Sequence, residues 1–352
     1  MRRFRTACCV AATLVCVGVA LLSSPTASAD SPIPICDPPA YAGVWHCRHT
    51  VGEAVVSVVL VDLNDPRVHL GTALPGFMDG AKFVECKSVN PAGRDPSSNC
   101  PGDKYPLERI PTMLRRYRRR GAVVAINADY FGFVDQSHGA EGLTVRAGHR
   151  LDGPAHNGNS GVPFIRSYMA VARDSTITFG RLIPGYGRFD LAGEFFNTVS
   201  GGPMLAQRGI VLPNEAACLA EQLPPEACLR EYQTVAGIAS AGHALVLAVG
   251  RRITAADLAR FLVETYGVAT AIKFDGGGSA QMAWLDALGN VRGFDAEIEV
   301  NDGFRPVAEG LLVFSTPLPL ANAEAGPALE FVWSLINREA AQKTCRVGTC
   351  AE

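Results

Sequence analysis

The strongest constraint in this sequence is an apolar segment that ends in a carboxylate and three consecutive glycines, Ala271–Gln281 (AIKFDGGGSAQ). Because side chains alternate along a strand, Lys273 and Asp275 share one of its faces. Burying two charges on one face costs free energy unless that face lines a site. Consecutive glycines let the backbone turn at positive φ and approach a ligand closely. The segment therefore predicts a functional site after a buried strand, with a plain tight turn as the alternative.

Two further segments repeat this design, in which an apolar strand stops at small polar residues. They are Val123–Gly132 (VVAINADYFG) and Asn197–Pro203 (NTVSGGP). Rigid scaffolds place catalytic and binding groups in the loops that follow strand ends. Either segment alone has the composition of an ordinary turn. Three such segments in one chain indicate a shared site.

The first residues predict a secretory signal peptide over residues 1–29. Arg2, Arg3 and Arg5 precede an apolar run, and a small-x-small cleavage sequence ends at Ala29. The apolar run is short for a membrane span, so a retained anchor is the less favoured alternative. We therefore expect a secreted protein, extracellular or associated with the cell envelope, with no integral membrane segment after cleavage.

Cysteine usage agrees with export. Three of the eleven cysteines lie in the signal segment, and the other eight form four neighbouring pairs: Cys36 and Cys47, Cys86 and Cys100, Cys218 and Cys228, and Cys345 and Cys350. An even count in a secreted chain predicts disulfides, and local pairing is the simplest of many connectivities. The competing zinc interpretation lacks a Cys-x-x-Cys or a close His–Cys grouping, so no metal is expected.

Charge and missing motifs exclude several classes of protein. Loss of three arginines with the signal peptide leaves 29 basic against 34 acidic residues, a formal charge of −5. This charge argues against nucleic acid as a general partner. There is no His-Glu-x-x-His zinc motif and no P-loop, and Gln281 stands where a Gly-x-Ser-x-Gly elbow ends in glycine. We expect no cofactor.

The spacing of apolar residues predicts an α+β fold, with a mixed, mainly antiparallel β-sheet, a few packing helices and disulfide staples. Helices are expected over residues 107–120, between Thr254 and Gly267, and over 329–341. Strands are expected over residues 54–62, 143–145, 168–172, 177–179, 235–238, 244–249, 268–275 and 311–314. Residues 75–105 form a long loop, and 212–232 form an insertion closed by a cysteine pair.

A basic run, Arg115–Arg120, ends the first expected helix. Its cations suit the C-terminal end of a helix dipole, so a solvated helix end is the favoured interpretation. Contact with a polyanionic glycan is the alternative.

Taken in order, six segments resemble the phosphodiester glycosidase family. They are residues 127–131 (NADYF), 141–145 (EGLTV), 200–205 (SGGPML), 233–238 (QTVAGI), 275–279 (DGGGS) and 305–308 (RPVA). The resemblance covers residues 122–315 and implies a hydrolase that acts on a sugar 1-phosphodiester, such as that of N-acetylglucosamine, in an envelope or extracellular glycan. Two positions depart from the family: Gln233 replaces a frequent arginine, and Glu309 replaces a frequent asparagine.

The chemistry of this reaction gives the candidate residues their roles. Hydrolysis at an anomeric carbon passes through an oxocarbenium-like state, which a carboxylate stabilises by attack or by activating water. Asp275 is our first candidate for this carboxylate, and Asp129 and Glu141 are candidates for a second. The candidate groups for binding sugar or phosphate are Asn127, Ser200, Gly201, Gly202, Lys273, Gly276, Gly277, Gly278, Ser279 and Arg305.

Some of these roles have alternatives. Asn127 holds an acetamido group or only caps a turn. Lys273 replaces the positive charge that Gln233 lacks, or only forms an ion pair with Asp275. A non-catalytic glycan-binding envelope protein on the same scaffold is the competing class; Asp275 favours an enzyme, whereas Gln233 favours such a binder.

The expected organisation has four regions. They are a signal peptide over residues 1–29, a strand and disulfide-stapled loop region over 30–105, a catalytic domain over 106–318, and a C-terminal helix with a disulfide over 319–352.

We predict that the mature protein contains no free thiol, because its eight cysteines form four close pairs. Thiol titration in denaturant, after removal of the signal peptide, is expected to detect no reactive group. Two or more reactive thiols per chain would refute complete local pairing.

Overall fold

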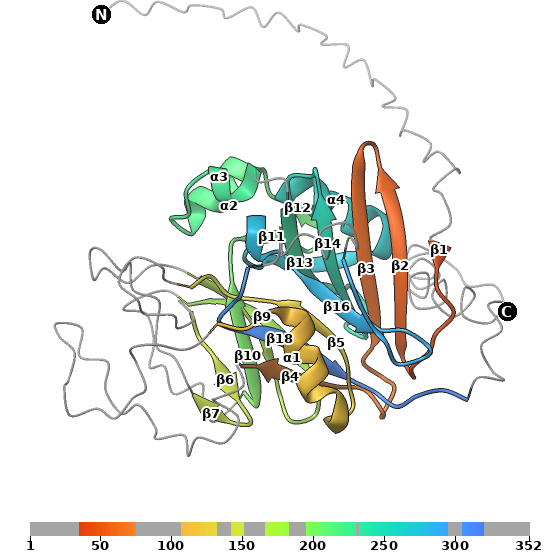
Figure 1. The fold of residues 1–352 in the computed structure, drawn as a ribbon. Coiled ribbons are helices and arrows are strands. Elements are labelled where there is room, and N and C mark those ends of the chain that lie inside the picture. Colours follow the sequence, from red (N-terminus) through yellow and green to blue (C-terminus); the bar gives the residue numbers. More distant parts are fainter. Residues whose placement is uncertain are drawn as a thin grey trace, which may run out of the picture. The chain divides into compact units, whose positions relative to one another are not determined.

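The computed structural model describes residues 35–74, 107–131, 142–150, 166–182, 195–229, 232–294 and 305–319. In these residues the strands form three antiparallel sheets (Figure 1). The largest sheet has the order β1 (Ile35–Cys36), β2 (Val44–Val51), β3 (Ala54–Asp62), β14 (Ala244–Arg251), β13 (Tyr232–Ala239), β15 (Val268–Lys273), β11 (Met204–Gln207) and β12 (Ile210–Val211). The expected α+β fold with mainly antiparallel sheets is confirmed.

Two five-stranded sheets complete the strands of the described residues. One has the order β7 (His149–Arg150), β6 (Val145–Arg146), β10 (Asn197–Gly201), β8 (Arg166–Val171) and β9 (Ile177–Leu182). The other has the order β17 (Val291–Gly293), β16 (Met282–Leu285), β5 (Ala122–Asn127), β18 (Gly310–Phe314) and β4 (His69–Ala73). The helices described are α1 (Ile110–Tyr117), α2 (Asn214–Ala220), α3 (Glu226–Leu229) and α4 (Ala255–Tyr266), with 3₁₀ turns η2 (Arg118–Arg120) and η4 (Gly277–Ser279).

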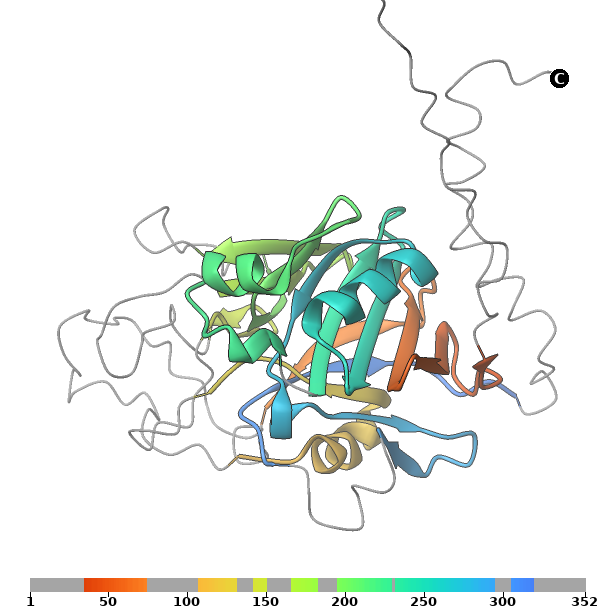
Figure 2. The same ribbon diagram turned by 90° about the horizontal axis from the view of Figure 1, so that it is seen from above.

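Alternation along β3 explains how the large sheet is buried on both faces. Val59 and Val61 belong to the core shared with β5 and β18, whereas Val58 and Leu60 belong to the core under α4. Successive side chains point to opposite faces, so a continuous apolar strand is stable only with a layer on each side. The sheet containing β5 supplies one layer and α4 the other (Figure 2).

Helix α4 begins and ends where its sequence signals predict. The Thr254 hydroxyl accepts a hydrogen bond from the Asp257 backbone N–H at 3.2 Å, and Gly267 ends the helix with φ +62°. Leu258 and Leu262 are fully buried on the side that faces the sheet. The helix leads directly into β15, and so it fixes the start of the strand that carries the candidate site.

The first helix also follows its signals, in two parts. α1 continues as η2 and stops at Gly121, which has φ +91°. In the basic run, Arg116 forms an ion pair with Glu108 at 2.8 Å and its guanidinium lies 4.5 Å from the Tyr117 ring centroid. Arg116 is therefore part of the local packing.

Two expected disulfides are present and confirm local pairing for these cysteines. Cys36 and Cys47 are bonded across β1 and β2, where they are register partners, and Cys218 and Cys228 close the insertion. The other two pairs, Cys86 with Cys100 and Cys345 with Cys350, lie outside the described residues. So do the signal peptide, the 75–105 loop and the expected helix over 329–341.

Several elements differ from the sequence-based expectation. The expected 268–275 strand ends at Lys273. The Phe274 N–H still donates to Thr234 O of β13 at 2.8 Å, but the Asp275 N–H donates to Ala128 O, after β5, at 2.7 Å. The chain thus leaves the large sheet and crosses to the loop after β5. The 143–145 strand reduces to β6, which begins at Val145, and strands β2 and β16 were not expected.

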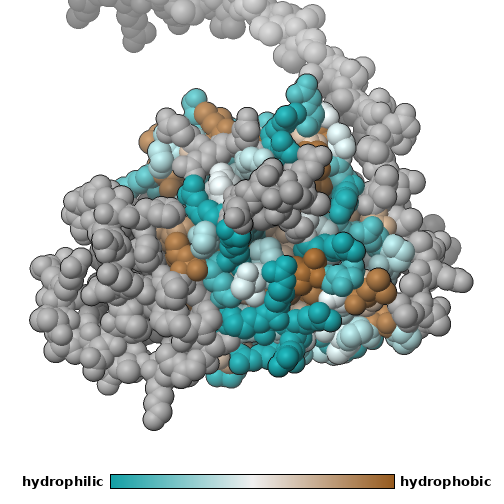
Figure 3. Space-filling view, viewed as in Figure 1, coloured by the Kyte–Doolittle hydropathy of each residue, from teal (hydrophilic) through white to brown (hydrophobic). Residues whose placement is uncertain are grey.

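No helix within the described ranges is both long and apolar enough to cross a bilayer. On the face shown in Figure 3, hydrophobic residues occur as separate patches among hydrophilic ones. Scattered apolar residues of this kind are normal on a protein surface.

Candidate active site

The Asn127 side chain joins three of the predicted motif segments at the end of β5. Its Nδ2 donates to Asp275 O at 2.8 Å. Its Oδ1 accepts from the Thr234 hydroxyl at 3.0 Å and from the Gln281 N–H at 2.8 Å. The residue is almost completely buried, 1 % exposed. These contacts favour the turn-holding role of Asn127 over contact with an acetamido group.

Asp275 lies where the large sheet meets the loop after β5. It is 7 % exposed, so its carboxylate is largely removed from solvent without being sealed. Its Oδ1 accepts from the Gly276 N–H at 2.8 Å. This hydrogen bond from the backbone of the turn fixes the orientation of the carboxylate.

The glycine turn after Asp275 passes between two cationic side chains. A Cβ added to Gly276 would lie 3.0 Å from Lys273 Nζ, and a Cβ added to Gly278 would lie 3.2 Å from an Arg305 guanidinium nitrogen. Gly277 has φ +60°, which favours glycine. The glycines therefore permit the close approach of Lys273 and Arg305, and the structure brings both predicted cations against the glycine turn that follows Asp275.

Lys273 is fully buried and contacts neutral oxygens. Its Nζ donates to the Tyr130 hydroxyl at 2.9 Å and to Phe274 O at 2.8 Å. It also lies 5.0 Å from the Tyr130 ring centroid, within range of a cation–π contact. Tyr130 belongs to the 127–131 segment (NADYF), but no role was predicted for it from the sequence.

The Ser200–Pro203 turn packs against the backbone of β15. The Gly202 N–H donates to Lys273 O at 2.7 Å, and Gly202 O accepts from the Tyr130 hydroxyl at 2.8 Å. The Ser200 hydroxyl donates to Leu143 O at 2.9 Å. Gly201 pairs with Ser167 of β8. The turn therefore supports β15 next to the candidate site. The Gly202 amide and the Ser200 hydroxyl both donate hydrogen bonds to backbone carbonyls in this structure.

Other predicted binding groups are also turned inward. The Gly276 N–H is bonded to Asp275, and Ser279 is fully buried at the end of η4. Arg305, by contrast, is exposed, and its backbone N–H donates to Gly278 O at 3.3 Å. Arg305 is thus the exposed cation at this turn.

The Asp129 carboxylate accepts hydrogen bonds from the protein backbone. One oxygen accepts from the Tyr130 N–H at 2.8 Å, and the other accepts from the Gly142 N–H. Asp129 is 1 % exposed, so it fastens the 142–145 segment to the end of β5. Glu309, the other family departure, accepts from the Thr144 hydroxyl at 2.5 Å and supports the same segment. Glu141 lies outside the described residues.

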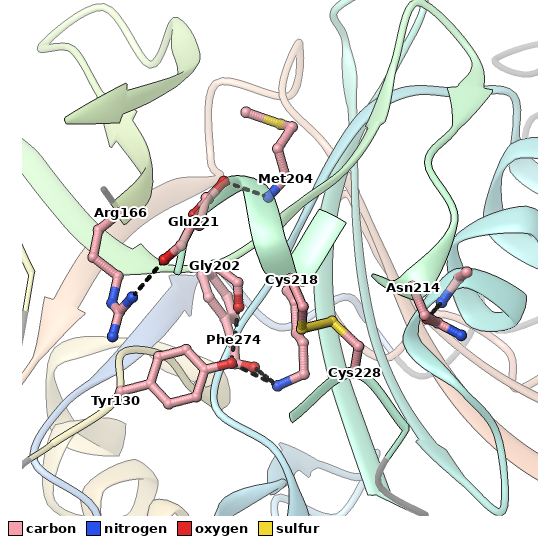
Figure 4. Close-up of a disulfide and its surroundings, with 11 residues drawn as sticks. Tyr130, Arg166, Gly202, Met204, Asn214, Cys218, Glu221, Cys228 and Phe274 are labelled. Carbon is pink, nitrogen blue, oxygen red and sulfur yellow. Dashed lines mark hydrogen bonds between the residues drawn. A yellow bond between two sulfur atoms is a disulfide. The ribbon is translucent and has the colours of Figure 1, made fainter. Parts of the chain in front are cut away.

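The structure adds a buried carboxylate that sequence reasoning missed. Glu221, in the disulfide-closed insertion, is fully buried and accepts from the Met204 N–H at 2.8 Å, two residues beyond Gly202 (Figure 4). A glutamate between two cysteines in a polar insertion gives no pattern that separates it from a solvated residue. Only its tertiary contacts identify it.

Two cavities in the described residues lie elsewhere. One, of about 510 Å³, is lined by Tyr41, His46 and Trp284 among others. There His46 stacks on Trp284 with ring centroids 3.8 Å apart, and burial lowers the His46 pKa against the opposing effect of its hydrogen bond to Asp37. The second, of about 900 Å³, lies between the β2–β3 turn and α4. Neither of these two cavities is lined by a predicted site residue. Nor does any cluster of three or more acidic, His or Cys side chains in the described part suit a metal ion.

Comparison with known proteins identifies the scaffold. Residues 120–314 match the sequence profile of the phosphodiester glycosidase family. No curated protein sequence matches the chain significantly.

Solved structures share the fold at low sequence identity. The catalytic domain of zebrafish N-acetylglucosamine-1-phosphodiester alpha-N-acetylglucosaminidase, auto-inhibited by its pro-peptide, is 20 % identical with a TM-score of 0.53. The similarity covers 82 % of this chain and 85 % of that one. A hypothetical protein from Synechocystis is 12 % identical with a TM-score of 0.51, covering 82 % of this chain and 65 % of that one.

We predict that Asn127→Ala lowers the free energy of unfolding by about 3 kcal/mol, because it leaves several buried polar partners unsatisfied. Denaturant unfolding followed by circular dichroism measures this loss. The exposed Asn64 is the matched control, and Asn64→Ala is expected to change stability by less than about 0.5 kcal/mol. A loss below about 1 kcal/mol for Asn127→Ala would show that its amide does not hold the site together.

Proposed function

This chain belongs to the phosphodiester glycosidase family, and we propose that it is a secreted hydrolase that cleaves a sugar 1-phosphodiester. The observation that carries the proposal is Asp275, held at a strand end beside a glycine turn that Lys273 and Arg305 flank. A carboxylate next to two cations matches a reaction in which positive charge develops on a sugar and negative charge on phosphate.

We propose that Asp275 acts at the anomeric carbon. The bond from this carbon to the phosphate oxygen breaks, and its electron pair stays on the phosphate. Asp275 attacks the carbon or takes a proton from the water that attacks it. Lys273 and Arg305 stabilise the charge on the departing phosphate, with Arg305 reaching it from the exposed side of the turn.

A phosphate leaving group reduces the need for a proton donor, because its second pKa is about 6. This agrees with the inward contacts of Asp129, whose carboxylate holds two backbone N–H groups. Glu141 remains our candidate for a second carboxylate.

The substrate class follows from the family and from the named activity of the zebrafish protein. We propose a phosphodiester of a sugar such as N-acetylglucosamine, in an envelope or extracellular glycan, reached after signal cleavage at Ala29. The glycan-binding alternative is favoured by Gln233, which is fully buried. Incubation with a glycosyl 1-phosphodiester separates the two: an enzyme releases free sugar, whereas a binder retains the intact compound.

We predict that Asp275→Asn lowers turnover of a glycosyl 1-phosphodiester by about 10³-fold or more, because an amide cannot act as base or nucleophile. The amide oxygen still accepts a hydrogen bond from the Gly276 N–H, so the melting temperature should stay close to that of the wild type. Asp174→Asn changes an exposed carboxylate and is the control. Activity of Asp275→Asn within a few fold of the wild type would remove Asp275 from the mechanism.

We predict that Lys273→Met lowers turnover of the phosphodiester by about 10²-fold but that of an activated aryl glycoside much less, because the aryl leaving group needs no cation. The comparison of kcat/KM for the two substrates measures this difference. An equal loss on both would mean that Lys273 only supports Tyr130 and Asp275.

A further inference from the structure

The insertion between β12 and β13 is closed on itself by a disulfide and anchored to the rest of the fold at α4. The Cys218–Cys228 disulfide closes it across α2 and α3. The Asn214 side chain accepts from the Ala256 N–H at the start of α4, at 2.8 Å (Figure 4). An insertion fixed by a covalent bond and by a helix contact is suited to present a side chain in a defined place.

That side chain is Glu221, which leaves the insertion and enters the interior between two sheets. Its carboxylate accepts four hydrogen bonds from three strands: from the Ser167 N–H at 2.9 Å, the Ser167 hydroxyl at 2.6 Å, Arg181 Nε at 2.9 Å and the Met204 N–H at 2.8 Å. A fully buried carboxylate is costly unless such donors satisfy it. Removing the charge or the donors therefore disturbs β8, β9 and β11 together.

Glu221 also packs against the Ser200–Pro203 turn. A Cβ added to Gly202 would lie 2.6 Å from Glu221 Oε2, so the carboxylate packs directly on Gly202. Gly202 has φ +146°, a conformation that favours glycine. The carboxylate holds the next part of the chain through the Met204 N–H.

Hydrogen bonds connect the Ser200–Pro203 turn to the candidate site. The Gly202 N–H donates to Lys273 O at 2.7 Å, and the Lys273 N–H donates to Pro203 O at 3.0 Å. The Tyr130 hydroxyl donates to Gly202 O and accepts from Lys273 Nζ. In Figure 4, Gly202 lies between Glu221 and Tyr130.

A second contact links Glu221 to the same tyrosine. Arg166 Nη1 donates to Glu221 O at 3.5 Å, and the Arg166 guanidinium carbon lies 5.2 Å from the Tyr130 ring centroid. Two short paths thus connect the insertion to Tyr130, and through it to the Lys273 ammonium.

We propose that Glu221 is a positioning residue. Through Gly202 and Met204 the insertion clamps the Ser200–Pro203 turn, and this turn holds Tyr130 and Lys273 in place for catalysis. The catalytic consequence rests on the proposed function, whereas the clamp itself does not. Glu221 touches no reacting atom in this arrangement and acts through Gly202.

The test compares Glu221→Gln with Glu215→Gln, an exposed glutamate of the same insertion. The side-chain nitrogen of a glutamine cannot accept hydrogen bonds from the N–H donors that surround Glu221. We expect amide hydrogen exchange in peptides covering residues 200–206 and 268–275 to quicken by about tenfold in Glu221→Gln. Peptides from β3 should be unchanged, and Glu215→Gln should match the wild type throughout.

Activity supplies a second readout. With a glycosyl 1-phosphodiester, kcat of Glu221→Gln should fall by about 10- to 100-fold while KM changes little, as for other supporting residues. If Glu221→Gln does not fold, the double variant Cys218→Ala/Cys228→Ala keeps the carboxylate but opens the insertion. It should quicken exchange at the same two peptides and lower kcat in the same direction.

Two results would overturn the clamp: exchange at residues 200–206 that stays at the wild-type rate, or exchange that quickens equally in β3. A wild-type protein that turns over no glycosyl 1-phosphodiester would instead refute the proposed function, and the exchange measurement would still decide the role of Glu221.

Discussion

The candidate site depends on one buried amide, that of Asn127. β5, which carries it, lies in one sheet, and Thr234 lies in another; Asn127 contacts Thr234, Asp275 and Gln281 through three hydrogen bonds. Most of the core that the two sheets share is apolar, and apolar packing is non-directional and tolerates small shifts. Hydrogen bonds in a buried network are directional and costly to leave unmade. The position of Asp275 is therefore set by this polar junction inside an otherwise apolar interface.

Local sequence signals were sufficient to predict those elements whose structure depends only on neighbouring residues. The β3 run, the α4 helix with its Thr254 cap and its Gly267 stop, and the glycine turn after Asp275 were all predictable. Alternation and capping depend on neighbouring residues, so they can be read from a short window. The convergence of the three motif segments was also expected, since all were strand ends rich in small polar residues.

The roles of individual polar side chains were not predictable in the same way. A short polar residue after a strand has the same sequence pattern whether it binds a ligand or its own backbone. Asn127, Asp129 and Ser200 all bind backbone groups far away in sequence, and only the tertiary fold places those groups. Glu221 was hidden for the same reason, because its donors come from three strands that precede the insertion in the chain.

The pairing of β13 with β15 determines what surrounds Gln233. Val235 is the register partner of Lys273, and the Phe274 N–H donates to Thr234 O, so continuing the antiparallel register places Gln233 opposite Asp275. The side chain at position 233 therefore lies close to the glycine turn that follows Asp275. Here the neighbour is neutral, and Lys273 reaches the same place from its own strand: a Cβ on Gly276 would lie 3.0 Å from Lys273 Nζ and 3.5 Å from Gln233 Oε1. The Lys273 ammonium therefore lies beside the glycine turn next to Gln233, and in our proposal it supplies the positive charge that a departing phosphate needs.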